Sequence, residues 1–124
     1  WGSSDAVEIA LQDPAKGSKA PVIVLRGYPC GTFQSSGEAG APKADVAKAR
    51  TGVQFAAKLP EAGRWTTEWR VSFAALGIDP KVTKKLNFNL TSRQSARGLW
   101  LLLVGPLDLA TWDVRNGAIL ELTD

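Results

Sequence analysis

The sequence predicts an all-β domain built as an antiparallel, jelly-roll-like β-sandwich. Short apolar or alternating segments recur along the 124 residues, and turn-forming Gly, Pro, Asn and Asp separate them. No segment has the sustained period of about 3.6 residues that a crossover helix would need, so a parallel sheet is not expected. With 44% hydrophobic and 22% charged residues, the chain can bury a core. We therefore expect residues 1–124 to form a single domain.

The first half of the chain contains two predicted strands and a long loop. Residues 6–12 alternate between apolar and polar side chains, which is typical of a half-buried strand. After a turn at residues 13–18, residues 21–27 contain β-branched Val and Ile side chains and are largely apolar, which predicts a buried strand. Residues 28–51 are broken by Gly, Ser and Pro and predict a long loop, with one or two helical turns over residues 44–50.

The second half begins with a predicted hairpin formed by residues 52–59 and 65–72. Residues 73–77 end in Gly and predict one helical turn with a glycine stop. Three further strands are expected at residues 86–91, 99–104 and 118–122. About seven strands are therefore predicted, enough for two packed sheets.

The composition excludes several classes of function. The chain has no His and a single Cys, so it cannot form a Ser-His-Asp triad, a Cys-His pair, a His-ligated metal site or an intrachain disulfide. Its net charge of +3 comes from basic residues scattered over many turns, which argues against a nucleic-acid partner. The longest apolar stretch, residues 99–104, is far shorter than the ~20 residues of a membrane-spanning helix.

Carboxylates are the remaining groups that could catalyse a reaction or bind a metal. A glycosidase needs two carboxyl groups about 5–10 Å apart, and no spacing in this chain singles out such a pair. No cofactor is expected, although a structural calcium ion could use aspartate oxygens. The candidate ligands are Asp5, Asp13, Asp79, Asp108 and Asp113. Residues 89–91 match a glycosylation acceptor sequence, but their alternating strand context argues against its use.

The five tryptophans divide into two groups. Trp65 and Trp69 share one face of a predicted strand, and Trp100 lies in a very apolar strand, so all three are expected in the core. Trp1 and Trp112 adjoin turn-rich segments and are expected to be exposed. An exposed indole can stack on the apolar face of a sugar ring when polar groups lie beside it. The polar candidates, all at strands or strand ends, are Glu8, Arg26, Asn87, Asn89 and Arg93.

An ordered set of short motifs resembles carbohydrate-binding module family 9 and its DOMON-like relatives. The set comprises Trp1 with the Asp-Ala-Val-Glu-Ile strand at residues 5–9, the Trp-Thr-Thr-Glu strand and Phe-Ala-Ala-Leu-Gly turn within residues 63–77, residues 87–93, and the closing strand at residues 117–122. The resemblance implies a non-catalytic β-sandwich appended to a glycoside hydrolase or another secreted enzyme. It also implies a secreted, periplasmic or cell-surface location.

The resemblance further implies a site in which two indole rings sandwich a mono- or oligosaccharide. Trp1 corresponds to the first wall and Trp100 to the second, and Trp112 competes with Trp100 for the second position. The implied polar partners are Glu8, Arg26, Asn89 and Arg93. Relatives that bind haem use Met and His ligands, and this chain contains neither.

The chain also departs from the family pattern at its N-terminus. Family domains carry further strands ahead of the segment that matches residues 5–9, whereas this sequence starts at Trp1. We expect the chain to be part of a longer protein, with the N-terminal strands of the sandwich missing. An open sheet edge invites pairing, so a partner chain or a dimer that completes the sheet is expected.

Two alternatives to sugar binding remain open. The domain could be a structural or protein-interaction β-sandwich without a sugar site, or, less in keeping with the residues, a hydrolase. Tryptophan rings exposed along one cleft would favour sugar binding, and burial of all five would favour the interaction domain. Two carboxylates placed closely in a cleft would favour the hydrolase.

Overall fold

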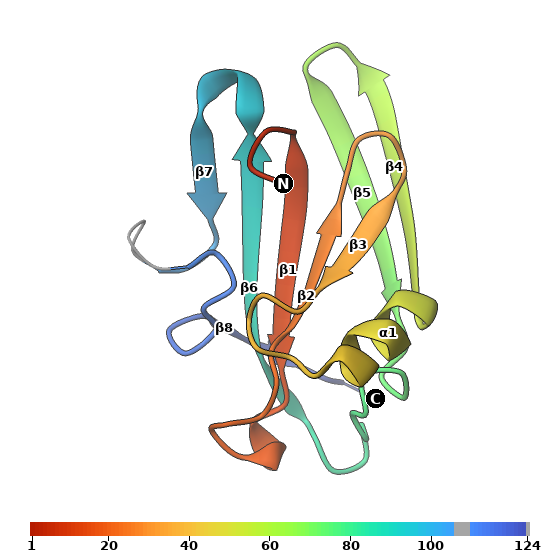
Figure 1. The fold of residues 1–124 in the computed structure, drawn as a ribbon, viewed down its shortest axis with the longest axis vertical. Helices are drawn as coiled ribbons and strands as arrows, with labels where there is room; N and C mark the ends of the chain where they lie inside the picture. The colour runs from red at the N-terminus through yellow and green to blue at the C-terminus, as the bar shows by residue number, and fades with distance from the viewer. Residues whose placement is uncertain (106–109, 124) are drawn as a thin grey trace.

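The computed structural model describes residues 1–105 and 110–123. These residues form eight strands, one α-helix and two short 3-10 helices, arranged as two antiparallel sheets. The all-β, antiparallel sandwich predicted from the sequence is confirmed. Figure 1 looks onto the larger sheet, with the smaller sheet behind it and to the right.

The larger sheet has six strands, and β6 is its longest member. Strand order is β3-β2-β1-β6-β7, and β8 also pairs with β6. Residues 91–94 of β6 pair with β7 and residues 85–88 pair with β8, so both short strands lie beside β6 on the side away from β1. The strand bounds are β1 (Ala6–Gln12), β2 (Ile23–Gly27), β3 (Phe33–Ser36), β6 (Lys85–Gln94), β7 (Leu99–Leu102) and β8 (Ala118–Glu121).

The smaller sheet is the hairpin of β4 (Val53–Glu61) and β5 (Arg64–Val71). We call the side of the larger sheet that points toward this hairpin the inner face, and the opposite side the outer face. Ile9 and Leu25 on the inner face form one buried cluster with Val53 of β4. Because side chains alternate along a strand, the odd-numbered apolar residues of β1 reach this core while its even-numbered residues point outward.

A glycine allows the two sheets to approach closely. A Cβ atom on Gly27, the last residue of β2, would lie 2.3 Å from Cε2 of Phe55 and 2.7 Å from Cζ2 of Trp69. The rings of Phe55 and Trp69 pack with their centroids 4.4 Å apart, and Phe33 of β3 contacts both. The missing side chain at Gly27 therefore makes room for this aromatic group.

Short helices close the lower end of the sandwich in Figure 1. The helix α1 (Lys43–Thr51) buries Ala49 against the core, and η1 (Pro14–Lys16) follows β1. The η2 helix (Ser95–Arg97) connects β6 to β7 at the other end. No helix among the described residues is both long and apolar enough to span a bilayer.

Three elements differ from the sequence-based prediction. The predicted loop at residues 28–51 contains the helix expected there, but it also contains β3, whose Phe-Gln-Ser-Ser sequence has no apolar alternation and which exists through its pairing with β2. Residues 73–77 form hydrogen-bonded turns, and not a helix, and these turns end at Gly77 with φ of 64°. The predicted strand at residues 99–104 is shorter, because β7 ends at Leu102.

Candidate functional site

The predicted polar site residues lie together on the outer face of the larger sheet. Glu8 of β1 lies directly opposite Arg26 of β2, and also opposite Thr91 of β6. Directly paired residues share a face, so all three side chains point outward. Asn89, Arg93 and Trp100 lie on the same face by the same register, because Asn89 pairs with Ala10, and Arg93 with both Ala6 and Trp100.

Glu8, Arg26 and Glu38 form a charged cluster at the centre of this face. Arg26 donates from Nε to Oε2 of Glu8 at 2.6 Å and from Nη2 to Oε1 of Glu38. Glu8 is 1% exposed and Arg26 is 4% exposed. Burial raises the pKa of the Glu8 carboxyl, and the side chains of Thr111 and Arg26 act in the opposite direction. No pattern in the sequence predicted that Glu38 belongs to the site, because it lies outside any strand in a Gly- and Ser-rich segment.

Two tryptophans and two arginines form a continuous stack above this cluster. The rings of Trp1 and Trp100 meet edge to face, with centroids 4.7 Å apart and planes at 81°. The Arg26 guanidinium lies 4.4 Å from the centre of the Trp1 ring, and that of Arg93 lies 4.6 Å from the centre of the Trp100 ring. Cation–π contacts of this kind contribute about 0.5–2 kcal/mol each.

This stack corrects the geometry that the family resemblance implies. Perpendicular rings in contact leave no space for a sugar between them, so Trp1 and Trp100 do not face one another as two walls in this structure. Arg93 also donates to the carbonyls of Gly2 at 2.9 Å and Leu99 at 3.1 Å, which ties both tryptophan-bearing segments together. Arg93 therefore holds the ring of Trp100 in place and is already bonded to protein groups.

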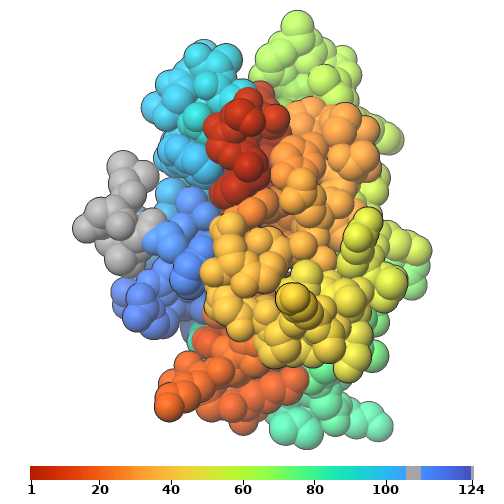
Figure 2. Space-filling view, viewed as in Figure 1, coloured from red at the N-terminus to blue at the C-terminus, as the bar shows by residue number. Residues whose placement is uncertain are grey.

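An open groove of about 550 Å³ runs along the outer face beside this stack. Its volume falls within the roughly 300–1,000 Å³ of typical ligand sites. Three tryptophans from distant parts of the chain line it, together with the carboxylate-bearing Glu38; they are Trp1, Trp100 and Trp112. Figure 2 looks onto this face, where the red N-terminal segment lies between the cyan segment leading into β7 and the orange segments around β3, with the blue segment after residue 110 below it.

The environments of the tryptophans differ in part from the prediction. Trp100 is half-buried on the outer face and not in the core, because the neighbouring leucines of β7 take the inner face. Trp1 and Trp112, expected to be exposed, are half-buried in the groove. Trp69 packs against the core as predicted, whereas Trp65 is half-buried and lines a hollow near the hairpin tip.

Asn89, one of the predicted polar partners for a sugar, already makes its hydrogen bonds within the fold. It is 2% exposed, and its amide Nδ2 donates to the carbonyls of Val104 at 2.9 Å and Asp113 at 3.1 Å. Its Oδ1 accepts from the backbone N–H groups of Leu90 at 3.0 Å and Val104 at 3.3 Å. Asn89 thus anchors two backbone segments over the sheet, one of which carries Trp112. We assign it a positioning role.

The candidate calcium ligands are dispersed and already hydrogen-bonded. Asp5 accepts from Ser95 N at 2.7 Å and Oγ at 2.6 Å, and these bonds hold the pKa of its carboxyl below the usual value. The other described candidates each accept protein hydrogen bonds elsewhere; they are Asp13, Asp79 and Asp113. Asp108 lies outside the described residues. Within residues 1–105 and 110–123, no three His, Cys, Asp or Glu side chains gather as a metal site.

Two carboxylates come together on the outer face, around the guanidinium of Arg26. Of these two glutamates, Glu8 is buried at the outer face, and only Glu38 lines the groove. Asn87, the remaining polar candidate, lies toward the far end of β6, where it donates to Oε1 of Gln12 at 2.9 Å. Among residues 1–105 and 110–123, the groove therefore offers aromatic rings and the accessible carboxylate of Glu38.

Comparison of the chain with protein-family models, curated proteins and solved structures finds no match.

Proposed function

We propose that the domain is a non-catalytic carbohydrate-binding module that holds a mono- or oligosaccharide in the groove on the outer face. The observation that supports this proposal is the gathering of Trp1, Trp100 and Trp112 around the Glu38 carboxylate in one groove of about 550 Å³. Indole rings stack on the C–H faces of sugars, and a carboxylate accepts hydrogen bonds from sugar hydroxyls. Both kinds of group are needed for selective sugar binding.

The residues of the site have distinct roles in this proposal. Trp100 and Trp112 provide stacking surfaces, and Glu38 accepts hydrogen bonds from sugar hydroxyls. Arg26 orients Glu38, because its guanidinium binds that carboxylate while the buried Glu8 holds it from beneath. Trp1 closes one side of the groove against Arg26 and Trp100. In line with the family resemblance, the module would serve a secreted, periplasmic or cell-surface enzyme.

Calorimetric titration with mono- and oligosaccharides chosen from a glycan array tests the proposal. We expect the wild type to bind, and Trp100→Ala or Trp112→Ala to abolish binding. Glu38→Gln should weaken binding about ten- to hundredfold, since charge-assisted hydrogen bonds are worth roughly 1.5–3 kcal/mol. Glu68→Gln is the matched control, because Glu68 is exposed on β5 of the smaller sheet. It should bind like the wild type.

Thermal melts of each variant separate loss of the site from loss of the fold. If the wild type binds none of the sugars, or if both tryptophan variants bind as tightly as it does, the assignment of this groove is wrong. The runner-up function, a structural or protein-interaction domain, would then take its place. One observation supports it in particular: the edge-to-face contact of Trp1 and Trp100 fills the space that a sandwiched sugar would use.

A further inference from the structure

The charge that the tryptophan groove presents to a ligand comes from Glu38. Among the described residues that line the groove, Glu38 is the one with a charged side chain, and that side chain is 39% exposed. Its Oε1 accepts a hydrogen bond from Arg26, and the structure gives its Oε2 no hydrogen bond within residues 1–105 and 110–123. A ligand in the groove therefore meets a free carboxylate oxygen.

The positive charge of Arg26 is balanced twice over beneath the groove. Its guanidinium is bound by the carboxylates of both Glu8 and Glu38, and Arg26 is 4% exposed. Two carboxylates that share one guanidinium leave one negative charge over when both are ionised. Glu8 is 1% exposed, so Glu38 is the member of the pair that carries this surplus into the groove.

Glu8 also has an oxygen without a partner. Its Oε2 accepts from Arg26, whereas its buried Oε1 has no hydrogen-bond partner among the described residues. Thr111 lines the groove and lies close enough to lower the pKa of the Glu8 carboxyl, but it does not complete a hydrogen bond to Oε1. An unpaired buried acceptor is costly, so this oxygen indicates that a hydrogen-bond donor comes from the side of the groove.

The indole rings of the groove are suited to positive charge. The guanidinium of Arg26 lies 4.4 Å from the centre of the Trp1 ring, and that of Arg93 lies 4.6 Å from the centre of the Trp100 ring. Trp112, the third tryptophan, has no such cation on its ring within the part of the chain that the structure describes. An indole face attracts a ligand cation in the same way. The ring of Trp112 is therefore available to a cationic ligand.

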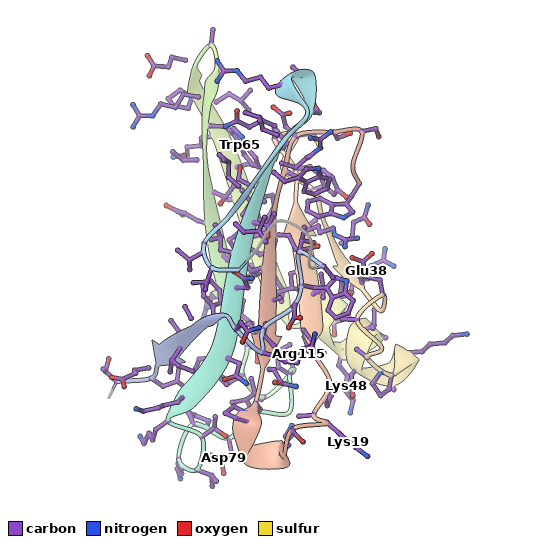
Figure 3. All side chains as sticks on the ribbon, turned by 90° about the vertical axis from the view of Figure 1, so that its left-hand side faces the viewer. Lys19, Glu38, Lys48, Trp65, Asp79 and Arg115 are labelled. Carbon is purple, nitrogen blue, oxygen red and sulfur yellow. The ribbon has the colours of Figure 1, made fainter. Side chains whose placement is uncertain are left out.

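The other charges near the groove are offset by charges of opposite sign. Arg93 lies close to the Asp5 carboxylate, and Arg115 binds Asp113. Figure 3 shows Glu38 on the outer side of the larger sheet, opposite to the smaller sheet, with Arg115 lower along the sheet. The surplus charge at Glu38 thus has no basic side chain beside it other than the buried Arg26 that it already binds.

We propose that the sugar held in this groove is an amino sugar whose free ammonium group binds Glu38. The inference rests on the proposed sugar-binding function and names the class of sugar. The ammonium donates to Oε2 of Glu38, and the C–H face of the sugar ring stacks on Trp112. A neutral sugar would leave the surplus negative charge uncompensated, and a carboxylated sugar would be repelled by it.

The preference for an ammonium group should be moderate, because Glu38 is partly open to water. Ion pairs exposed to water change affinity by a few-fold, and charge-assisted hydrogen bonds in drier sites by more. We expect the wild type to bind glucosamine about five- to tenfold more tightly than glucose. The preference should shrink as the NaCl concentration rises from about 0.05 to about 0.5 M, since salt screens the charge of Glu38.

Calorimetric titration with mono- and trisaccharides of glucosamine, N-acetylglucosamine, glucose and glucuronic acid tests the inference. These sugars share the arrangement of the ring and differ in charge, and acetylation removes the charge of the amine. Glucosamine should bind most tightly and glucuronic acid least. Glu38→Gln should reduce the preference for glucosamine over glucose to within about twofold.

Glu68→Gln is the matched control, because it removes the same charge from an exposed position on the smaller sheet. It should keep the preference of the wild type. Thermal melts establish whether Glu38→Gln is folded, and the salt dependence of the wild type tests the inference without any variant.

The inference is overturned by equal binding of glucosamine and glucose, by binding confined to uncharged or carboxylated sugars, by a preference that 0.5 M NaCl leaves unchanged, or by a preference that survives in folded Glu38→Gln. In each of these cases the wild type still binds a sugar, so the sugar-binding proposal stands. If the wild type binds no sugar of any class, both proposals are wrong.

Discussion

Glu8 binds Arg26 at 2.6 Å directly across two neighbouring strands, in a position from which water is almost excluded. The register of β1 against β2 creates this pair, and Glu38 extends it toward the groove. Burial of an ion pair costs desolvation energy, which the attraction between the charges offsets only in part. The main role of the Glu8–Arg26 pair is therefore to orient Arg26, and not to stabilise the fold.

The stability of the domain should fall as pH rises through the raised pKa of Glu8. Burial raises this pKa above the ordinary value of 4.5, so the folded state binds the proton more tightly than the unfolded chain. The stabilising contribution of protonated Glu8 is complete at pH values below the pKa of the unfolded state. It is lost as pH rises through the pKa of the folded state. Thermal melts from pH 4 upward should show this fall in the wild type.

Glu8→Gln should remove that part of the pH dependence, because an amide does not titrate. Glu68→Gln, at an exposed position on β5, should retain it. Asp5 and Asp113 act at lower pH: hydrogen bonds from Ser95 and Arg115 lower the pKa values of their carboxyls, so their contributions are lost as pH falls below about 3.8. If the stability of Glu8→Gln fell with pH above 4.5 as steeply as that of the wild type, Glu8 would not be the group that causes the fall.

Asn89→Ala should destabilise the fold by about 3 kcal/mol or more. The substitution removes four hydrogen bonds and leaves the buried carbonyl of Asp113 and the partly buried backbone groups of Val104 without these partners; an unpaired buried group costs roughly 1–3 kcal/mol. Asn87→Ala is the matched control, since Asn87 is half-buried and its amide donates to Gln12. Urea unfolding of the two variants should differ by at least 1 kcal/mol, and equal losses would argue against the anchoring role of Asn89.

Gly27→Ala should cost roughly 1–3 kcal/mol, because the new methyl group would press against Phe55 and Trp69 at the contact between the sheets. Gly37→Ala offers a comparison: there a Cβ atom would lie 3.5 Å from its nearest neighbours, at ordinary contact distance. Its effect on the free energy of unfolding should stay within about 0.5 kcal/mol. Denaturant unfolding measures both, and a well-tolerated Gly27→Ala would mean that the sheets separate more easily than this packing indicates.

Trp69→Ala should be more damaging than Trp65→Ala. Trp69 contacts both Phe33 and Phe55 beside the core, so its removal should cost about 3–5 kcal/mol. Trp65 borders the open hollow, where water already reaches the ring, and a smaller loss is expected. Thermal and urea unfolding of the two variants provide the comparison, and equal losses would show that Trp65 is packed as tightly as Trp69.

The sequence predicted the strands whose side chains alternate and missed features that depend on remote pairing. Val7, Ile9 and Leu11 reveal β1 locally, because one face of the strand is buried. By contrast, β3 has no such pattern and forms only because β2 offers an edge. The outward position of Trp100 follows from the register of β7 against β6, which the continuous apolar run does not specify.

The candidate site likewise contains residues that the sequence predicted and one, Glu38, that it did not. Glu8, Arg26 and Arg93 lie on strands, and the family resemblance named them as polar partners; that they share one face follows from the register of β1 with β2 and β6. Glu38 lies in the segment after β3, and it joins the site only through its bond to Arg26. Sequence spacing carries no signal for such a contact, because it depends on how a loop folds back over the sheet.

The burial of Asn89 also determines when its acceptor sequence could be used by a glycosylating enzyme. Residues 89–91 match that sequence, yet the Asn89 amide is enclosed between the backbone carbonyls of Val104 and Asp113. An oligosaccharide linked to this nitrogen would displace both carbonyls and separate β6 from the segments that cover it. Modification is therefore compatible only with the unfolded chain, and a glycan at Asn89 would mark molecules in which this sheet never closed.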